Sequence, residues 1–309
     1  MKMSNVTTVH RFDAIEAEVE NCNTRSVLFH DPHFKERLFE KIDSLAPQGN
    51  FVLSFDVFDT LLLRNQKSEL RRFIEIGQRM SAFRKKSGLK NTTPRDLDTL
   101  INSLSLSDID AFLARHLGTK ASYRAGKKVA GYGEGSLIEI QCTASKILNG
   151  SDRLKDDFIE IELSYEAEGL SVNDALLSYA TRHKQNGGKV ILVSDMYMHA
   201  EHIENLLGRL KIDLELFDLI ISSADTKISK SSGKIFEEIE KILNEPSDRF
   251  IHIGDSIDGD YIKARKAGWR ALHLPISTAE MSERISDHAL LSEMLEDKFS
   301  IRTDIQAPR

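Results

Sequence analysis

The chain has 309 residues, 40% of them hydrophobic and 29% charged, a composition that is typical of a globular protein and excludes a disordered or fibrous one. Its net charge of -6 argues against general nucleic-acid binding, and no apolar run approaches the ~18 residues of a membrane span. Its two cysteines, Cys22 and Cys142, lie far apart and lack metal-ligand spacing, which is typical of a reducing compartment, so we expect a cytoplasmic protein. From the charge and the missing span we expect that it binds neither nucleic acid nor membrane. The oligomeric state is left open.

Residues 1-47 are expected to form an N-terminal helical extension. Apolar residues recur at helical spacing between residues 11 and 45, which predicts two amphipathic helices, the second opened by Asp31-Pro32. A turn signal follows at residues 47-50, and the apolar run 51-55 has no helical period. This run predicts a strand that is buried on both faces and is followed by acidic residues.

Residues 65-164 show a helical pattern, with start signals at Thr93-Pro94 and Ser107-Asp108. We interpret this segment as an inserted helical cap without strands. Between Lys67 and Lys128 it contains 14 Lys and Arg but only 6 Asp and Glu, so it offers a basic surface to an anionic ligand. The glycine-rich stretch 131-135 does not follow a strand, and we interpret it as a mobile cap loop rather than a phosphate-binding loop.

Strands alternate with single helices in the rest of the chain, a pattern that predicts an α/β fold with a Rossmann-like, doubly wound parallel sheet. The core domain is assigned to residues 48-64 and 165-278, and residues 279-309 to a C-terminal helical tail. The later strands are predicted at 190-193, 219-222, 250-253 and 271-274, and the helices at 173-183, 199-210, 233-243 and 261-267.

Four predicted strand ends carry polar residues, and ligands of open parallel sheets bind at the carboxyl ends of strands. Asp56 follows the first strand, Ser194 ends the second, Lys230 comes after the third and Asp255 ends the fourth, with Asp260 five residues beyond.

This set suits phosphoryl transfer. Asp56 would attack as a carboxylate nucleophile, and Asp255 would join it in an oxygen-ligand site for Mg²⁺. Ser194 and Lys230 would stabilise the phosphoryl oxygens.

The motifs around these residues resemble those of the haloacid dehalogenase superfamily. Within it, they resemble a subgroup of bacterial hydrolases often associated with surface-polysaccharide synthesis. The stretches that carry the resemblance are Phe55-Asp56-Val57-Phe58-Asp59-Thr60-Leu61-Leu62-Leu63-Arg64, Val193-Ser194-Asp195-Met196-Tyr197, Lys230-Ser231-Ser232-Gly233-Lys234-Ile235-Phe236 and His252-Ile253-Gly254-Asp255-Ser256.

The resemblance implies a phosphatase with Mg²⁺ held by Asp56, the Phe58 carbonyl and Asp255, with Asp260 as a further candidate ligand. A small phosphorylated substrate, such as a sugar or polyol phosphate, is the expected partner. The candidate substrate contacts are Thr60, Arg64, Arg71, Arg72 and Tyr197.

One position departs from the superfamily pattern, because Phe58 stands where phosphatases usually carry a second Asp that protonates the leaving oxygen. Asp59, Tyr197 and His199 are the candidate replacements, and general acid catalysis is typically worth ~10²- to 10⁴-fold. A phosphonatase, which would need a cap lysine, and a catalytically silent phosphate-binding protein remain alternatives. Carbon-halogen cleavage is disfavoured, because dehalogenases usually replace the Gly-Asp that is intact here as Gly254-Asp255.

Overall fold

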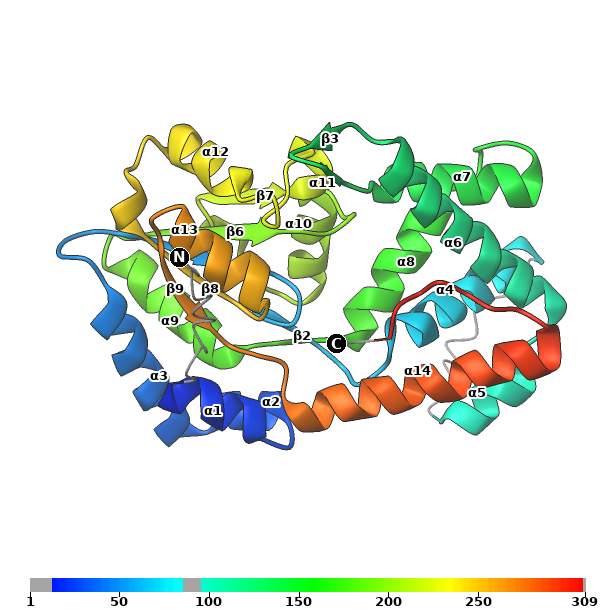
Figure 1. Ribbon diagram of the computed structural model, residues 1–309, viewed down its shortest axis with the longest axis horizontal. Coiled ribbons are helices and arrows are strands. Elements are labelled where there is room, and N and C mark those ends of the chain that lie inside the picture. Colours follow the sequence, from blue (N-terminus) through cyan, green and yellow to red (C-terminus); the bar gives the residue numbers. More distant parts are fainter. Residues whose placement is uncertain (1–12, 86–95, 308–309) are drawn as a thin grey trace, which may run out of the picture.

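The computed structural model describes residues 13-85 and 96-307 (Figure 1). Five parallel strands form one sheet in the order β7-β6-β1-β8-β9. The strands are β1 (Val52–Phe55), β6 (Lys189–Ser194), β7 (Leu219–Ser222), β8 (Phe250–Gly254) and β9 (Arg270–His273). This arrangement confirms the predicted doubly wound parallel sheet.

The central strand β1 is buried on both faces, which explains its apolar sequence. Leu53 and Phe55 face an apolar core shared with α3 (Pro32–Leu45), α9 (Asp174–Gln185) and α10 (Ala200–Arg209). Val52 faces a second core, shared with α12 (Lys234–Leu243) and α13 (Lys263–Lys266). Because β1 pairs with β6 on one side and β8 on the other, its end lies between two neighbouring strand ends.

The N-terminal extension contains three helices in its described part, so the prediction of two was wrong. They are α1 (Ala14–Asn21), α2 (Arg25–His30) and α3. Cys22 has an extended backbone, with φ -74° and ψ 153°, and ends α1. Helices of eight and six residues are too short for their apolar periodicity to separate them in the sequence.

A second group of helices surrounds its own apolar core. It comprises α4 (Glu69–Arg84), α5 (Leu97–Ser103), α6 (Leu106–Ala125), α7 (Leu137–Asn149) and α8 (Lys155–Gly169). The predicted start at Thr93-Pro94 lies outside the described residues. The expectation of a segment without strands was wrong, because β3 (Lys128–Val129) and β4 (Tyr132–Gly133) form a hairpin around Ala130-Gly131, which have positive φ angles of 51° and 88°.

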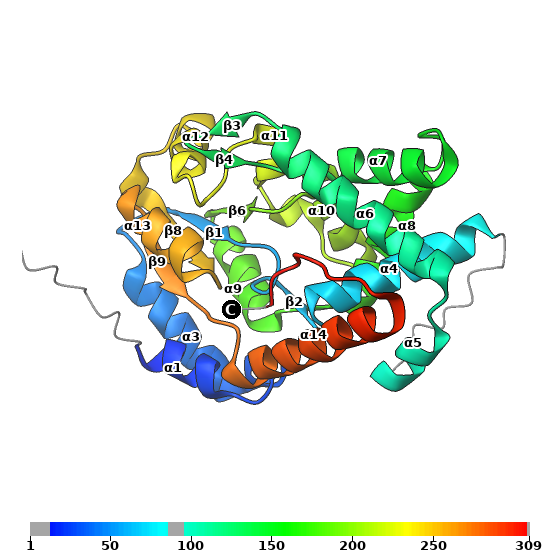
Figure 2. The same ribbon diagram turned by 45° about the vertical axis from the view of Figure 1, so that its right-hand side comes forward.

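The C-terminal helix α14 (Thr278–Phe299) connects the two parts of the molecule. It packs along α4 (Figure 2) and adds Leu291, Met294 and Leu295 to the core of the second helix group. The antiparallel pair β2 (Leu62–Arg64) and β5 (Leu170–Val172) lies where the chain leaves and re-enters the sheet domain. The domain boundaries at residues 47, 64, 164 and 278 remain predictions. Within the described ranges, no helix is long and apolar enough to cross a membrane.

Candidate active site

One cavity of about 270 Å³ lies at the carboxyl ends of the central strands. The structure brings Asp56, Ser194, Lys230, Asp255 and Asp260 together there. The full lining is Asp56, Phe58, Asp59, Arg64, Ser194, Asp195, Met196, Lys230, Ser231, Asp255, Ser256, Gly259 and Asp260.

Lys230 links two carboxylates in this cavity. Its Nζ lies 2.5 Å from Asp56 Oδ1 and 2.6 Å from Asp260 Oδ1. The backbone N–H of Lys230 donates to Asp195 Oδ1 at 3.1 Å, which fixes the loop after β7 against the loop after β6. Asp260 also faces His252 Nε2 at 3.0 Å and accepts from the Ser256 backbone N–H at 3.0 Å.

Three carboxylates crowd the same space, since Asp56, Asp255 and Asp260 each offer an oxygen within 4.8 Å of the others. Burial and the Asp260 charge together outweigh Lys230 and raise the pKa of Asp56 to about 6. Burial, and then the charges of Asp56 and Asp59, raise the pKa of Asp255 well above its usual value. Burial alone would raise the pKa of Asp260, but Lys230 and His252 together outweigh burial and hold that pKa below its usual value.

This donor set fits a divalent cation. Carboxylate oxygens are the ligands that Mg²⁺ prefers, and a cation would relieve the mutual repulsion that raises the pKa of Asp56 and Asp255. Both oxygens of Asp260 already accept hydrogen bonds, so Asp56 and Asp255 fit a direct ligand role better than Asp260 does. Phe58 lines the cavity next to them.

The comparison with family models assigns this chain to one family. The model described as haloacid dehalogenase-like hydrolase matches residues 52–268, which include β1, the carboxylate cluster and Lys230. The chain belongs to the haloacid dehalogenase-like hydrolases. A search of curated proteins finds no match.

Solved structures of several bacterial proteins are similar to this chain at low identity. An uncharacterized protein from Listeria monocytogenes serotype 4b is 22% identical over 33% of this chain and 60% of its own, with a TM-score of 0.31. A putative haloacid dehalogenase-like hydrolase from Bacteroides fragilis is 18% identical over 77% and 93%, with a TM-score of 0.40. The putative HAD-hydrolase YfnB from Bacillus subtilis, bound to magnesium, is 17% identical over 72% and 88%, with a TM-score of 0.42.

Asp59, a predicted acid of this hydrolase, lies in an arginine cluster. Its Oδ1 is 2.8 Å from Arg25 Nη2 and 2.7 Å from Arg284 Nη2, and its Oδ2 is 3.8 Å from Arg64 Nη1. The Arg284, Arg25 and Arg64 charges outweigh burial and hold the pKa of Asp59 well below its usual value. A carboxylate with a lowered pKa carries no proton at neutral pH, which argues against Asp59 as the general acid.

Several other predicted contacts lie outside the cavity lining. Tyr197 is 5% exposed, and its hydroxyl binds Arg115 and Glu162 of the helical segment, so the structure does not place it as a substrate contact.

The remaining predicted residues outside the lining also have partners in the protein or are buried. Arg71 pairs with Glu75 and Asp287, Arg72 pairs with Glu166, and Thr60 is buried. His199 binds Ser136 Oγ at 2.7 Å and Asp225 Oδ1 at 2.6 Å, at the junction of α7 and α10.

Five cavity residues were not predicted as site residues: Asp195, Met196, Ser231 and Ser256, which stand inside the motif stretches, and Gly259, which stands outside them. The sequence could have indicated them, because each directly adjoins a residue that was predicted to lie in the site. Arg64, which was selected, lies with its guanidinium carbon 4.2 Å from the centre of the Phe58 ring. That contact places a cation beside the position of the missing second Asp.

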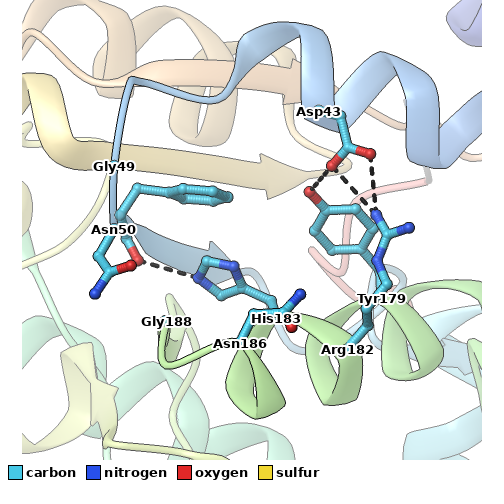
Figure 3. Close-up of a pocket in the computed structure, with 9 residues that line it drawn as sticks. Asp43, Gly49, Asn50, Tyr179, Arg182, His183, Asn186 and Gly188 are labelled. Atoms are coloured by element: carbon cyan, nitrogen blue, oxygen red, sulfur yellow. Dashed lines mark hydrogen bonds and ion pairs between the residues drawn. The ribbon is translucent and has the colours of Figure 1, made fainter.

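A second cavity, of about 330 Å³, lies at the amino ends of β1 and β6 (Figure 3). There, Asp43 binds the Tyr179 hydroxyl at 2.6 Å and Arg182 at 3.0 Å, and His183 Nε2 lies 3.0 Å from the Phe51 carbonyl oxygen. These side chains are engaged with one another. Among the described residues, the cluster of three carboxylates that could hold a metal ion lies in the smaller cavity and not in this larger one.

Proposed function

We propose that this hydrolase is a Mg²⁺-dependent phosphoric monoester hydrolase that forms an aspartyl-phosphate intermediate on Asp56. The observation that supports this most is the convergence of Asp56, Lys230, Asp255 and Ser194 on one cavity. Phosphoryl transfer requires an in-line nucleophile and positive charge at the equatorial oxygens, and these residues can supply both.

In the proposed first step, an Asp56 carboxylate oxygen attacks the phosphorus atom and the bond from phosphorus to the substrate oxygen breaks, so that the alcohol leaves and its oxygen takes a proton from solvent water. In the second step, water attacks the aspartyl phosphate, which releases inorganic phosphate and regenerates Asp56. Bound Mg²⁺ would supply positive charge beside the transferred group. Lys230 would hold Asp56 in place, and the Ser194 hydroxyl, buried without a partner among the described residues, would donate to a phosphoryl oxygen.

Phe58 cannot protonate the leaving oxygen, and Asp59 is ion-paired. We therefore propose that esters with good leaving groups react fastest, because their cleavage depends least on a general acid. Arg64 is the cavity side chain that we propose for contact with the rest of the substrate.

The substrate class that we propose is a sugar or polyol phosphate, in line with the motif resemblance to hydrolases of surface-polysaccharide synthesis. The lining is mainly polar, and its volume is at the small end for a ligand pocket. A cytoplasmic location is part of this proposal, supported by the free thiols of Cys22 and Cys142. A phosphonatase is less well supported, because the lysine found in the cavity lining is Lys230 and no described cap lysine joins it.

The test is a screen of sugar phosphates, polyol phosphates and p-nitrophenyl phosphate with Mg²⁺. Asp56→Asn should abolish turnover, and a chelator should abolish it reversibly. Asp156→Asn, at a side chain that is 87% exposed, is the matched control and should retain wild-type rates. Turnover that persists in Asp56→Asn, or that ignores the chelator, would refute the proposal.

A further inference from the structure

Both terminal segments reach the catalytic loops through buried polar side chains. The helices α1 and α2 precede the family match at residues 52–268, and α14 follows it. Figure 1 shows α1 and α2 beside the start of α14, in agreement with the contacts between α1 and α14. The contacts described next connect these three helices, which lie outside the matched region, to the loops that carry Asp56 and Asp255.

The first connection runs from α2 to the loop after β1. Arg25 is 1% exposed and donates from Nη1 to the Asp59 carbonyl oxygen at 2.6 Å and from Nη2 to Asp59 Oδ1 at 2.8 Å. Its Nε donates to Glu280 Oε2 of α14 at 2.6 Å. One guanidinium thus holds both the backbone and the side chain of a residue three positions after Asp56.

Asp59 has a backbone that depends on such support. Its φ is 62°, in the left-handed region that costs energy for residues other than glycine and that Asp tolerates better than most. Arg284 of α14 binds both of its carboxylate oxygens, at 2.7 Å and 3.1 Å. The two arginines therefore stabilise the turn that sets the direction of Asp56 and Phe58.

The second connection runs from α1 to the loop after β8. Glu16 is 3% exposed, and its Oε1 lies 2.9 Å from His273 Nδ1. The other ring nitrogen, Nε2, lies 2.8 Å from the Asp255 carbonyl oxygen. The imidazole therefore ties the backbone of Asp255 to the N-terminal extension.

We propose that Arg25, Arg284 and Glu16 are positioning residues, through which the N-terminal extension and α14 hold the Asp56 and Asp255 loops at the spacing that a divalent cation needs. This inference rests on the proposed function. The physical reason is that Asp56 and Asp255 offer carboxylate oxygens within 4.8 Å of each other, and like charges at this distance repel, so loops without external restraint would move apart before a cation binds. Partners that orient metal ligands are typically worth ~10- to 100-fold in metal affinity or activity.

A merely structural role predicts a different result. If these contacts only stabilised the fold, their loss would lower the unfolding temperature and leave the folded protein with unchanged loops and metal affinity. A positioning role predicts altered loops in protein that is still folded.

The test compares Arg25→Met with Arg37→Met. Arg37 lies in the same extension but forms an exposed ion pair with Glu18, at 2.5 Å, away from the catalytic loops. Hydrogen exchange of peptides covering residues 56–62 and 253–260, Mg²⁺ affinity by calorimetry, and kcat and KM are measured well below the unfolding temperature. We expect faster exchange in the 56–62 peptide, ~10-fold or more weaker Mg²⁺ binding and a fall in kcat with little change in KM, in Arg25→Met alone.

Unchanged exchange and unchanged Mg²⁺ affinity in folded Arg25→Met would overturn the inference. If that variant does not fold, Arg284→Lys takes its place, because one ammonium keeps the charge but cannot bind both Asp59 oxygens as the guanidinium does. Hydrogen exchange requires no activity. Wild-type protein that neither binds Mg²⁺ nor cleaves phosphate esters would thus refute the proposed function separately, while exchange still decides the positioning role.

Discussion

Lys230 Nζ lies 2.5 Å from Asp56 Oδ1, and both side chains are buried at the end of the central strand. The same ammonium lies 2.6 Å from Asp260 Oδ1. Burial of a charge is costly unless the charge is paired, so the three groups stabilise one another. Lys230 therefore both orients Asp56 and offsets part of the negative charge in the cavity.

Replacing Lys230 with Met should lower kcat for a phosphate ester by ~10²- to 10³-fold, the usual effect of removing one electrostatic stabiliser. Because the variant loses the cation that faces Asp56, the pKa of Asp56 should rise further above about 6. Lys234→Met, at a side chain that is 52% exposed, is the matched control. Steady-state kinetics would contradict the prediction if Lys230→Met kept a rate close to that of the control.

Mg²⁺ should stabilise the folded protein, and its removal should lower the unfolding temperature. A ligand that binds only the native state adds ~2.7 kcal/mol at a concentration 100 times its Kd. Asp56→Asn removes one carboxylate of the buried cluster, while Lys230 stays paired with Asp260. Because burial and the Asp260 charge outweigh Lys230 at Asp56, we expect the variant to have a higher unfolding temperature in chelator and a smaller shift with Mg²⁺. Differential scanning calorimetry measures both effects, and a wild-type protein that shows no Mg²⁺ shift would contradict the prediction.

Tyr197→Phe should reduce stability and leave substrate binding unchanged. The hydroxyl accepts from Arg115 Nη2 at 3.0 Å and donates to Glu162 Oε1 at 3.0 Å. Its loss removes hydrogen bonds worth ~1 kcal/mol each in the free energy of unfolding, while Arg115 keeps its contact with Glu162. Urea unfolding and KM distinguish the roles, since a raised KM at unchanged stability would restore Tyr197 as a substrate contact.

The sequence was sufficient to predict the residues at the strand ends. Parallel strands end at one edge of the sheet, so Asp56, Ser194 and Asp255 are expected to meet once the strands are recognised. Each strand is a short apolar run bounded by turn residues, and its signal is local. The prediction of the fold rested on this regularity.

The arginine cluster around Asp59 was not predictable in the same way. Arg25 lies 34 positions from Asp59 and Arg284 lies 225 positions from it. No periodicity connects residues on α2, α14 and the loop after β1, and an arginine is most often a surface residue. The hairpin at residues 128-133 was missed for another reason, because strands of two residues are too short to show alternation.

His183 should make the free energy of unfolding depend on pH. Its Nε2 lies 3.0 Å from the Phe51 carbonyl oxygen, and its ring centre is 4.1 Å from that of Phe51. Burial lowers the pKa of His183 from the usual 6.5. Between this lowered pKa and 6.5 the unfolded chain binds more protons than the native one, so stability rises with pH there and is lost as the pH falls.

His183→Gln should flatten this dependence, because glutamine can still donate to the Phe51 carbonyl but does not titrate. Urea unfolding between about pH 5 and 7, the range in which histidine usually titrates, should therefore show a smaller slope in the variant than in the wild type. His30→Gln, at an exposed position, should keep the wild-type slope. Equal slopes in wild type and His183→Gln would assign the pH dependence to other groups, and the cavity of Figure 3 would then play no part in it.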